Sequence, residues 1–284
     1  MKVGFVGLGK MGSVMAPHLA DDSTMVLGFD VNWQMPQDSP VQQANDIAEL
    51  ADCAVIFTML PDGNVVLKAV NQLIDAGSEA LIVDMSSCHP DTASAMHDLL
   101  AARKIPYLDA PVSGGVAKAQ SANLTIMVGG DAANYSKAER LLAKMGRPVH
   151  IGPNGAGYAM KALNNYVSAA GLVSSFQALA TATSYGIAPE DFQAVINGST
   201  GRNNTTEVKI DKFVLTQAYN SGFALNLMAK DVGIASDIIT KSGFDVPFTH
   251  LLADYLNEAL GRLQGDPDHT EIYRDITDSA IKKP

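Results

Sequence analysis

Lys161 and Asn165 are the residues whose types and spacing first suggest chemistry in this sequence. They follow a glycine-rich turn, Gly155–Gly157, in a stretch with few charges. Positions four apart lie on one face of a helix, so an ammonium group and an amide would both reach one bound oxygen. We expect nearby apolar residues to desolvate the ammonium group and lower its pKa toward neutrality, which suits proton transfer. Those apolar neighbours are Tyr158, Met160, Leu163 and Val167.

Ser113, Gly114 and Gly115 form a second candidate, for binding rather than for proton transfer. One hydroxyl and unhindered backbone N–H groups can hold a carboxylate without a formal positive charge. A plain turn between a strand and a loop is the alternative, because the same residue types favour turns. Taken alone, these three residues leave both interpretations open, just as Lys161 alone is compatible with a surface lysine whose stem packs on the helix.

The spacing Gly7-x-Gly9-x-x-Gly12 follows a β-rich run, Lys2–Val6, and precedes an expected helix from Met11 to Ala20. In a dinucleotide-binding turn the first glycine permits the tight turn and the second admits a pyrophosphate. The third lets helix and strand pack closely, and the N–H groups at the start of the helix face the phosphates. The pattern therefore favours a dinucleotide site over an ordinary tight turn.

Asp30 ends the second predicted strand, Met25–Phe29. Its distance from the glycine turn suits a carboxylate that accepts hydrogen bonds from the ribose hydroxyls. A carboxylate repels a 2′-phosphate, and no arginine occurs in Val31–Trp33 to receive one. The sequence therefore favours NAD over NADP.

Strands and helices alternate through the first half of the chain, which predicts α/β structure with a mostly parallel sheet. Further strands are expected at Ala54–Met59, Leu81–Val83, Pro106–Asp109 and Leu124–Val128, and helices at Val65–Ala76 and Asp91–Ala102. After Gly152–Gly155 the strand pattern stops. The second half is predicted to be all-α, with helices at Ala156–Tyr185, Pro189–Asn197, Ala224–Ser242 and Pro247–Gly261. We expect two domains, 1–154 and 155–284.

The composition excludes several classes of protein. Hydrophobic residues make up 47% and charged residues 18% of the 284 residues, which is typical of an ordered globular enzyme. The net charge of −10 comes without a cluster of Lys or Arg, so neither nucleic acid nor a membrane surface is an expected partner. Two cysteines cannot form a disulfide framework, and the six histidines lack the spacing of a metal site. The N-terminus does not continue as a signal peptide, so we expect a cytoplasmic protein.

Four motifs in the same order resemble those of the β-hydroxyacid dehydrogenase family, which includes 3-hydroxyisobutyrate dehydrogenase and tartronate semialdehyde reductase. They are the cofactor turn Gly7–Met15, the substrate motif Asp109–Gly115, the catalytic helix Gly155–Asn165, and Leu227–Asp231. The resemblance implies an N-terminal Rossmann-like domain, an all-α C-terminal domain and a long interdomain helix that joins them. It also implies a homo-oligomer, a dimer or a tetramer.

The resemblance further implies an NAD(P)-dependent oxidoreductase that reversibly oxidises a small 3-hydroxy acid to the aldehyde or keto acid. Lys161 would be the general acid/base, and the anionic substrate would be held by Ser113, Gly114, Gly115 and Asn165. The cofactor-binding residues would be Gly7, Leu8, Gly9, Lys10, Met11, Gly12, Asp30, Leu60, Pro61, Asn64, Ser86 and Lys230. For Lys230, a surface residue paired with Asp231 is the alternative. No metal is expected.

The chain departs from the family pattern at two glycines, which are Lys118 and Ala122 here. Residues with a Cβ atom lose the positive-φ freedom of glycine, so the loop is expected to run differently or to be stiffer. Lys118 would either hold a second anionic or polar group of the substrate or remain an exposed lysine without a role. Two alternative functions stay open: an imine reductase of the same architecture, although those enzymes commonly lack the catalytic lysine, and a non-catalytic NAD-binding interaction protein.

Overall fold

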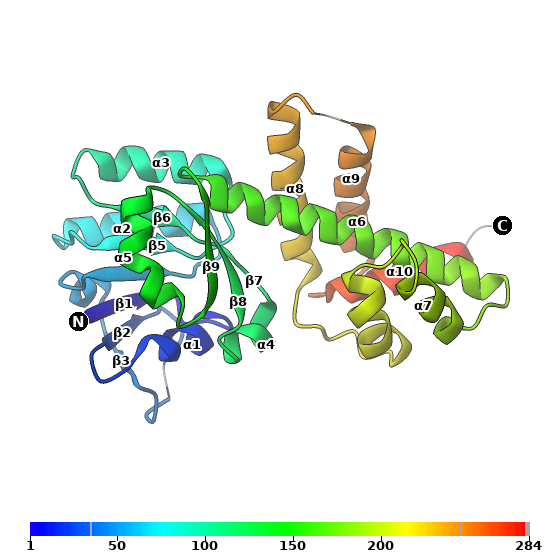
Figure 1. Cartoon of the computed structure of the whole chain (residues 1–284), viewed down its shortest axis with the longest axis horizontal. Helices are drawn as coiled ribbons and strands as arrows, with labels where there is room; N and C mark the ends of the chain where they lie inside the picture. Colours follow the sequence, from blue (N-terminus) through cyan, green and yellow to red (C-terminus); the bar gives the residue numbers. More distant parts are fainter. Residues whose placement is uncertain (35, 245, 282–284) are drawn as a thin grey trace. The chain divides into compact units, whose positions relative to one another are not determined.

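The computed structural model describes residues 1–34, 36–244 and 246–281. The chain divides into two compact units, the first Met1–Lys161 and the second beginning at Ala162. The division falls inside one long helix, α6 (Ala156–Ser184), whereas the predicted boundary lies just before that helix. The predicted combination of a Rossmann-like first domain, a helical second domain and a long helix that joins them is confirmed (Figure 1).

A mixed sheet forms the centre of the first unit. Within the described residues the strand order is β3-β2-β1-β4-β5-β6-β8-β7, and β9 pairs with β8. The pairs from β3 to β6 are parallel, whereas β8 is antiparallel to both β6 and β7. The strands are β1 (Lys2–Val6), β2 (Met25–Phe29), β3 (Val41–Gln43), β4 (Val55–Thr58), β5 (Leu81–Asp84), β6 (Tyr107–Asp109), β7 (Val112–Ser113), β8 (Leu124–Gly129) and β9 (Gly146–Gly152).

Strand residues alternate between two hydrophobic cores, one on each face of this sheet. In β4, Val55 and Phe57 belong to one core and Ile56 to the other. The alternation follows from the two-residue period of a strand, and it requires both faces to be covered. The helices of this unit are α1 (Gly12–Met15), α2 (Gly63–Asp75), α3 (Pro90–Ala101), α4 (Gly115–Gln120) and α5 (Ala132–Leu142).

The predicted helix from Met11 to Ala20 is shorter than expected. It is α-helical only as α1 and continues as a 3₁₀-helix from Ala16 to Leu19. Pro17 explains the change, because proline lacks the N–H that would donate within an α-helix. By contrast, α2 begins where Asp62 caps it, since its carboxylate accepts hydrogen bonds from the N–H groups of Asn64 and Val65 at 2.9 and 3.1 Å.

The second unit is helical, as predicted. Its elements are the rest of α6, α7 (Pro189–Asn197), a π-helix η3 (Thr205–Leu215), α8 (Leu225–Lys241), α9 (Pro247–Arg262), a 3₁₀-turn η4 (His269–Glu271) and α10 (Ile272–Ile281). Its core contains fully buried side chains from α6, η3, α8 and α9, for example Phe176, Ile210, Val232 and Leu256. The π-helix and α10 were not predicted.

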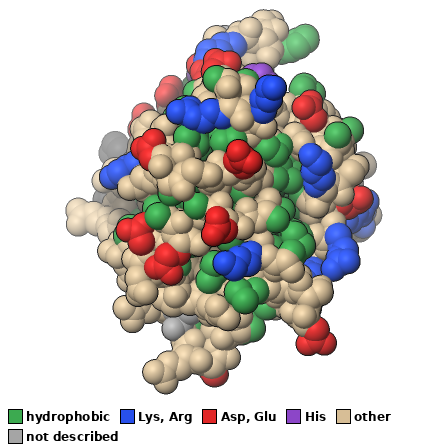
Figure 2. All heavy atoms as spheres, turned by 90° about the vertical axis from the view of Figure 1, so that its left-hand side faces the viewer, with side chains coloured by type: hydrophobic (Ala, Val, Ile, Leu, Met, Phe, Trp, Pro, Cys, Tyr) green, Lys and Arg blue, Asp and Glu red, His purple; other side chains and the backbone are tan. Residues whose placement is uncertain are grey.

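The surface view in Figure 2 shows Lys and Arg side chains interspersed with Asp and Glu on the face that it presents. No run of basic side chains forms on this face. None of the described helices is long and apolar enough to cross a membrane.

Candidate active site

The glycine turn after β1 has the geometry that a dinucleotide requires. Gly7 has a φ of +95°, and a Cβ atom at Gly12 would lie 1.8 Å from the carbonyl oxygen of Gly7. A Cβ atom at Gly9 would meet nothing within 4 Å, so the backbone there borders open space. Among the described residues, the N–H groups of Gly9, Lys10 and Met11 have no hydrogen-bond partner. The turn therefore fits a pyrophosphate, which accepts hydrogen bonds from such groups.

Asp30 connects the end of β2 to this turn. One carboxylate oxygen accepts a hydrogen bond from the N–H of Leu8 at 2.7 Å, and the other accepts from the N–H groups of Asn32 and Trp33 at 2.8 and 3.0 Å. The N–H of Leu8 is therefore occupied by Asp30 and does not point at a phosphate. Asp30 thus connects the turn to the loop after β2, and its carboxylate remains partly exposed.

Ser86 makes a hydrogen bond to the loop after β4, which the sequence predicts to contact the cofactor. The Ser86 hydroxyl, which is 1% exposed, accepts a hydrogen bond from the N–H of Leu60 at 2.9 Å. Pro61 is exposed, and Asn64 lies exposed at the start of α2. The structure thus places Leu60, Pro61 and Asn64 on one surface segment and gives Ser86 a supporting contact to that segment.

The start of α6 is anchored by Asp109, the last residue of β6. Its two carboxylate oxygens accept hydrogen bonds from the N–H of Gly155 at 2.8 Å and the N–H of Tyr158 at 3.0 Å. Burial raises the pKa of Asp109 to about 6, although these N–H groups oppose that rise. Gly157 permits this close approach, because a Cβ atom there would lie 2.5 Å from the carbonyl oxygen of Asp109. Sequence reasoning identified Asp109 only as part of a motif and missed this role.

Ser113, Gly114 and Gly115 lie together at the end of β7 and the start of α4. Gly114 and Gly115 have φ values of +141° and +64°, which favour glycine. A Cβ atom at Gly114 would lie 2.6 Å from the Cβ of Lys118, so the Lys118 stem packs against the glycine backbone. Lys118 itself is exposed. Open backbone of the kind that we predicted for a carboxylate is therefore found at Gly115, where a Cβ atom would meet nothing within 4 Å, whereas at Gly114 the Lys118 stem occupies that space.

Ala122 shows what the second glycine replacement does. Its φ is +51°, so the backbone keeps the left-handed conformation that a glycine adopts freely. Holding an alanine there costs about 1 kcal/mol. The loop therefore keeps the positive-φ conformation at Ala122, and the replacement of glycine by alanine strains the backbone there.

Lys161 and Asn165 lie one turn apart on α6, as their spacing predicts. Asn165 is 6% exposed, and its amide donates a hydrogen bond to the carboxylate of Asp231 at 2.5 Å. The expected desolvation of Lys161 is only partly met. Met160 and Val167 are 44% and 68% exposed, because these two positions, seven residues apart, share a face that the chain leaves open. Tyr158 is fully buried.

Asp231 is a functional candidate that sequence reasoning mentioned only as a partner of Lys230. Its side chain is buried, and its other carboxylate oxygen lies 3.6 Å from the ammonium nitrogen of Lys230. Asp231 therefore connects Lys230 to Asn165 and fixes the orientation of the Asn165 amide. The pairing proposed as the alternative for Lys230 does exist, but its acidic partner is in the interior rather than on the surface. The adjacent pair Lys230-Asp231 was the available signal.

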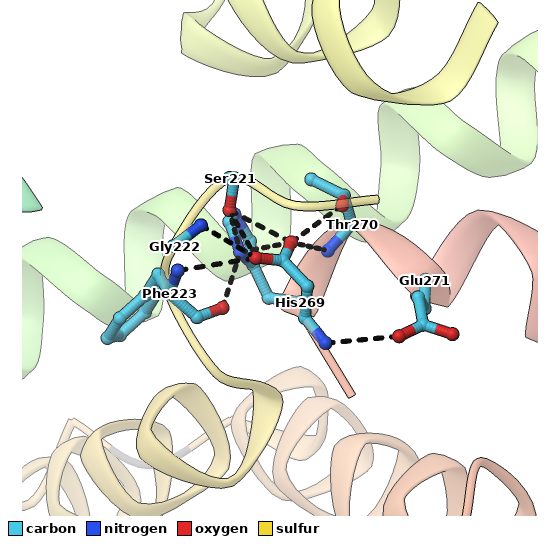
Figure 3. Close-up of polar contacts among 7 residues, drawn as sticks. Ser221, Gly222, Phe223, His269, Thr270 and Glu271 are labelled. Atoms are coloured by element: carbon cyan, nitrogen blue, oxygen red, sulfur yellow. Dashed lines mark hydrogen bonds and ion pairs between the residues drawn. The ribbon is translucent and has the colours of Figure 1, made fainter. Parts of the chain in front are cut away.

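A second polar cluster in the helical unit contains none of the predicted site residues. The carboxylate of Asp268, which precedes η4, accepts hydrogen bonds from Ser221, Gly222, Phe223 and Thr270. Figure 3 labels these four donors together with His269 and Glu271. His269 is 3% exposed, and its Nε2 has no hydrogen-bond partner among the described residues. No group of three or more His, Cys, Asp or Glu residues in the described ranges is arranged to hold a metal ion.

Two family models together match nearly the whole chain. The NAD binding domain of 6-phosphogluconate dehydrogenase matches residues 2–153. The model described as NAD-binding of NADP-dependent 3-hydroxyisobutyrate dehydrogenase matches residues 155–276. The glycine turn and Ser113–Gly115 fall within the first matched region, and Lys161 and Asn165 fall within the second.

Individual relatives agree with these models. The chain is 35% identical over 260 residues to 2-(hydroxymethyl)glutarate dehydrogenase of Eubacterium barkeri, covering 88% of this chain and 86% of that protein. It is 32% identical over 267 residues to the NAD-dependent L-serine dehydrogenase of Pseudomonas aeruginosa, covering 88% of this chain and 89% of the relative. The solved structure of Mycobacterium tuberculosis 3-hydroxyisobutyrate dehydrogenase with L-serine superposes with a TM-score of 0.85 at 29% identity, covering 97% of this chain and 98% of that one.

Solved imine reductases are more distant. They superpose with TM-scores of 0.65 and 0.61 at 16% and 18% identity, which establishes a shared fold alone. The matched models, the relatives and the glycine turn, substrate motif and α6 residues all agree, and the chain belongs to the β-hydroxyacid dehydrogenase family.

Proposed function

We propose that this protein uses NAD to oxidise, reversibly, the hydroxyl group of a small 3-hydroxy acid, with Lys161 as the general acid/base. The observation that carries the proposal is the pair Lys161 and Asn165, one turn apart on a helix whose start is anchored by Asp109. An anchored helix presents an amine and an amide in a fixed arrangement, and fixed positioning is a large part of catalysis.

The proposed proton step uses Lys161. In the oxidation, the neutral amine accepts the proton of the substrate hydroxyl, and in the reduction the ammonium group returns it to the forming alkoxide. The nicotinamide, when bound, accepts or supplies the hydride. Asn165 would donate a hydrogen bond to the same oxygen through its second amide hydrogen, because the first is bonded to Asp231.

The substrate carboxylate is assigned to Ser113, Gly114 and Gly115, whose hydroxyl and backbone N–H groups suit an anion. Lys118 lies beside them with its stem against Gly114, and we assign to it a second anionic or polar group of the substrate. A preference of the parent enzyme for dicarboxylic over monocarboxylic 3-hydroxy acids would support that assignment. The relative from Eubacterium barkeri is named for a glutarate, which is a dicarboxylate.

NAD is the proposed cofactor rather than NADP. Asp30 places a carboxylate at the end of β2, and the sequence has no arginine before Arg103 that could receive a 2′-phosphate. One relative is named as NAD-dependent. Lys230, paired with Asp231, is assigned to the nicotinamide end of the cofactor. A cytoplasmic homo-oligomer stays a prediction, which light scattering after size exclusion would test for subunit number.

The decisive experiment follows NADH absorbance for the parent, Lys161→Ala and Lys137→Ala with a panel of 3-hydroxy acids. We expect Lys161→Ala to lower kcat by about 10³-fold, the scale of general acid/base catalysis. NADH binding, followed by fluorescence, is expected to be retained. Lys137→Ala is the matched control, because it removes an exposed lysine of α5.

Three outcomes would contradict the proposal. A Lys161→Ala variant as fast as the parent would remove the assigned proton step. A parent that reduces cyclic imines but oxidises no 3-hydroxy acid would favour the imine reductase. A parent that binds NADH without turning over any acid or imine would favour the non-catalytic protein. Running the panel with NADP as well as NAD tests the cofactor preference.

A further inference from the structure

Tyr158 makes hydrogen bonds to two buried carboxylates, one through its side chain and one through its backbone. Its hydroxyl donates a hydrogen bond to Asp84, and its backbone N–H donates to Asp109 at 3.0 Å. Asp84 and Asp109 are register partners at the ends of the neighbouring parallel strands β5 and β6. The Tyr158 side chain is fully buried, and it lies in the first turn of α6, three residues before Lys161.

Asp84 also connects to the predicted cofactor loop. It accepts hydrogen bonds from the hydroxyl groups of Thr58 at 2.7 Å and Ser86 at 2.5 Å. Ser86 in turn accepts from the N–H of Leu60 at 2.9 Å. An unbroken path of hydrogen bonds therefore leads from the backbone after β4, through Ser86 and Asp84, to the Tyr158 side chain.

The direction of these hydrogen bonds is fixed by the chemistry of the groups. An ionised carboxylate only accepts, so the hydroxyl groups of Thr58, Ser86 and Tyr158 must all point their hydrogens at Asp84. The hydroxyl groups of Tyr107 and Tyr158 are 2.8 Å apart. Because the Tyr158 hydrogen is committed to Asp84, Tyr107 must be the donor of that pair. Each buried hydroxyl of this network thus has one defined orientation.

The Tyr158 hydroxyl is not needed to fill the core. Tyr158 packs in the apolar cluster that includes Met96 and Ile105, where a phenylalanine ring would occupy the same space. Burying a hydroxyl among such residues costs free energy unless it is hydrogen-bonded. The hydroxyl therefore contributes the connection to Asp84 rather than apolar packing.

We infer that Tyr158 is a positioning residue for the reaction, which holds the turn of α6 that carries Lys161 in a fixed place relative to the cofactor loop at Leu60. The inference rests on the proposed function, because it assumes that Lys161 transfers the proton. Loss of the connection leaves Lys161 and the loop in place on average but lets their separation vary. A displacement of about 1 Å between reacting groups can cost up to about 100-fold in rate.

The test compares Tyr158→Phe with Tyr107→Phe in the full-length enzyme. Both variants remove one buried tyrosine hydroxyl, but only the first breaks the connection to Asp84. For Tyr158→Phe we expect kcat to fall about tenfold, with less than a twofold change in KM for NAD. The primary deuterium isotope effect on hydride transfer is expected to rise, because chemistry becomes more rate-limiting. For Tyr107→Phe, both quantities are expected to stay within about twofold of the parent.

Hydrogen exchange provides a measurement that does not depend on activity. We expect the amides of residues 155–161 and of Leu60 to exchange faster in Tyr158→Phe than in Tyr107→Phe. If both variants match in kcat, isotope effect and exchange, the inference is wrong. The inference is equally wrong if the fall in kcat for Tyr158→Phe equals the loss of folded, NADH-binding enzyme, while the isotope effect and the pH profile of kcat stay unchanged. Such a result would indicate a merely structural role.

The outcome for Lys161→Ala separates this inference from the function on which it rests. If Lys161→Ala equals the parent while Tyr158→Phe still accelerates exchange at Leu60, the proposed proton step fails and the connection through Asp84 stands. If Lys161→Ala is inactive and Tyr158→Phe equals the parent in every readout, the function stands and the positioning role is excluded.

Discussion

The two units of this protein each bury a carboxylate cluster, and the two clusters are built differently. In the first unit, the donors to Asp84 and Asp109 that the described residues provide are neutral, namely hydroxyl groups, backbone N–H groups and the thiol of Cys88. In the second unit, Asp268 lies with His269 and near Lys209, whose side chain is also buried. The first cluster thus holds negative charge by hydrogen-bond geometry, and the second combines acidic and basic groups.

This difference appears in the pKa values. Burial raises the pKa of Asp84 above its usual range despite the donors around it. At Asp268 burial also acts to raise the pKa, but hydrogen bonds from His269, Thr270 and Ser221 outweigh it, and the pKa is lowered. Burial lowers the pKa of Lys209 to about 8. The first cluster is therefore suited to fixing distances, and the effect of pH on its stability falls in the acidic range of its carboxylates, whereas Lys209 makes the stability of the second unit depend on pH in the alkaline range.

Asp109→Asn should have the largest effect on stability, because it replaces one of the two hydrogen-bond acceptors of Asp109 by a donor. An asparagine places an NH₂ group against the N–H of Gly155 or of Tyr158, which leaves a buried donor without a partner. We expect a loss of about 3 kcal/mol in the free energy of unfolding, measured in urea. Asp131→Asn is the control, because Asp131 is exposed and its side chain makes no capping hydrogen bond. Equal stability of the two variants would contradict our account of the first cluster.

Lys209→Met tests the second cluster through pH. The pKa of Lys209 is about 8 in the folded protein and 10.5 at its ordinary value, so between these values the unfolded chain binds a proton that the folded chain does not. The free energy of unfolding of the parent should therefore rise with pH across that window, and the rise should disappear in Lys209→Met. At pH 7 the variant should be more stable by about 2 kcal/mol, because it no longer buries a charge.

The measurement for this prediction is a series of urea titrations from pH 7 to pH 10.5, with Lys212→Met as the control for an exposed lysine in the same π-helix. If the parent shows no slope, or if Lys209→Met keeps the slope of the parent, then Lys209 is not the group that makes the second cluster sensitive to pH.

The smallest expected difference lies between two variants that each remove one hydroxyl donor, one from each cluster. Thr58→Val should cost about 2 kcal/mol, because Asp84 is fully buried and the donors to it in the part of the chain that the structure describes are neutral. Ser221→Ala should cost only about 0.5 kcal/mol, because Asp268 keeps the donors of Thr270 and of the backbone. Thermal unfolding of the pair measures the difference. A larger loss for Ser221→Ala would reverse the comparison between the clusters.

The parts of this structure that the sequence predicted are those set by local patterns. The glycine turn and Asp30 could be identified because tight turns and the ends of strands leave recognisable residues at fixed spacings. Lys161 and Asn165 were placed on one helical face by a spacing of four. The strands β4 and β5 and the helices α2, α7, α8 and α9 were predicted near their observed bounds for the same reason.

What the sequence did not predict depends on contacts between distant residues. Asp84 receives Tyr158 from 74 positions away and Thr58 from 26, and no local pattern indicates such partners. The strands β3 and β7 are too short for a period to appear, and β9 contains Gly146 and Pro148. The burial of Asp231 likewise follows from packing in the helical unit.

The position of the unit boundary inside α6 determines where this chain can be cut. A fragment that stops at Asn154 would lack the backbone donors to Asp109 and the phenol that reaches Asp84. The carboxylates of Asp84 and Asp109 would then lack hydrogen-bond donors that they have in the full chain, and such a truncated product would tend to misfold on expression. A separable nucleotide-binding fragment has to retain the opening turns of the helix that follows it, and an exchange of modules between relatives is best joined downstream of Lys161.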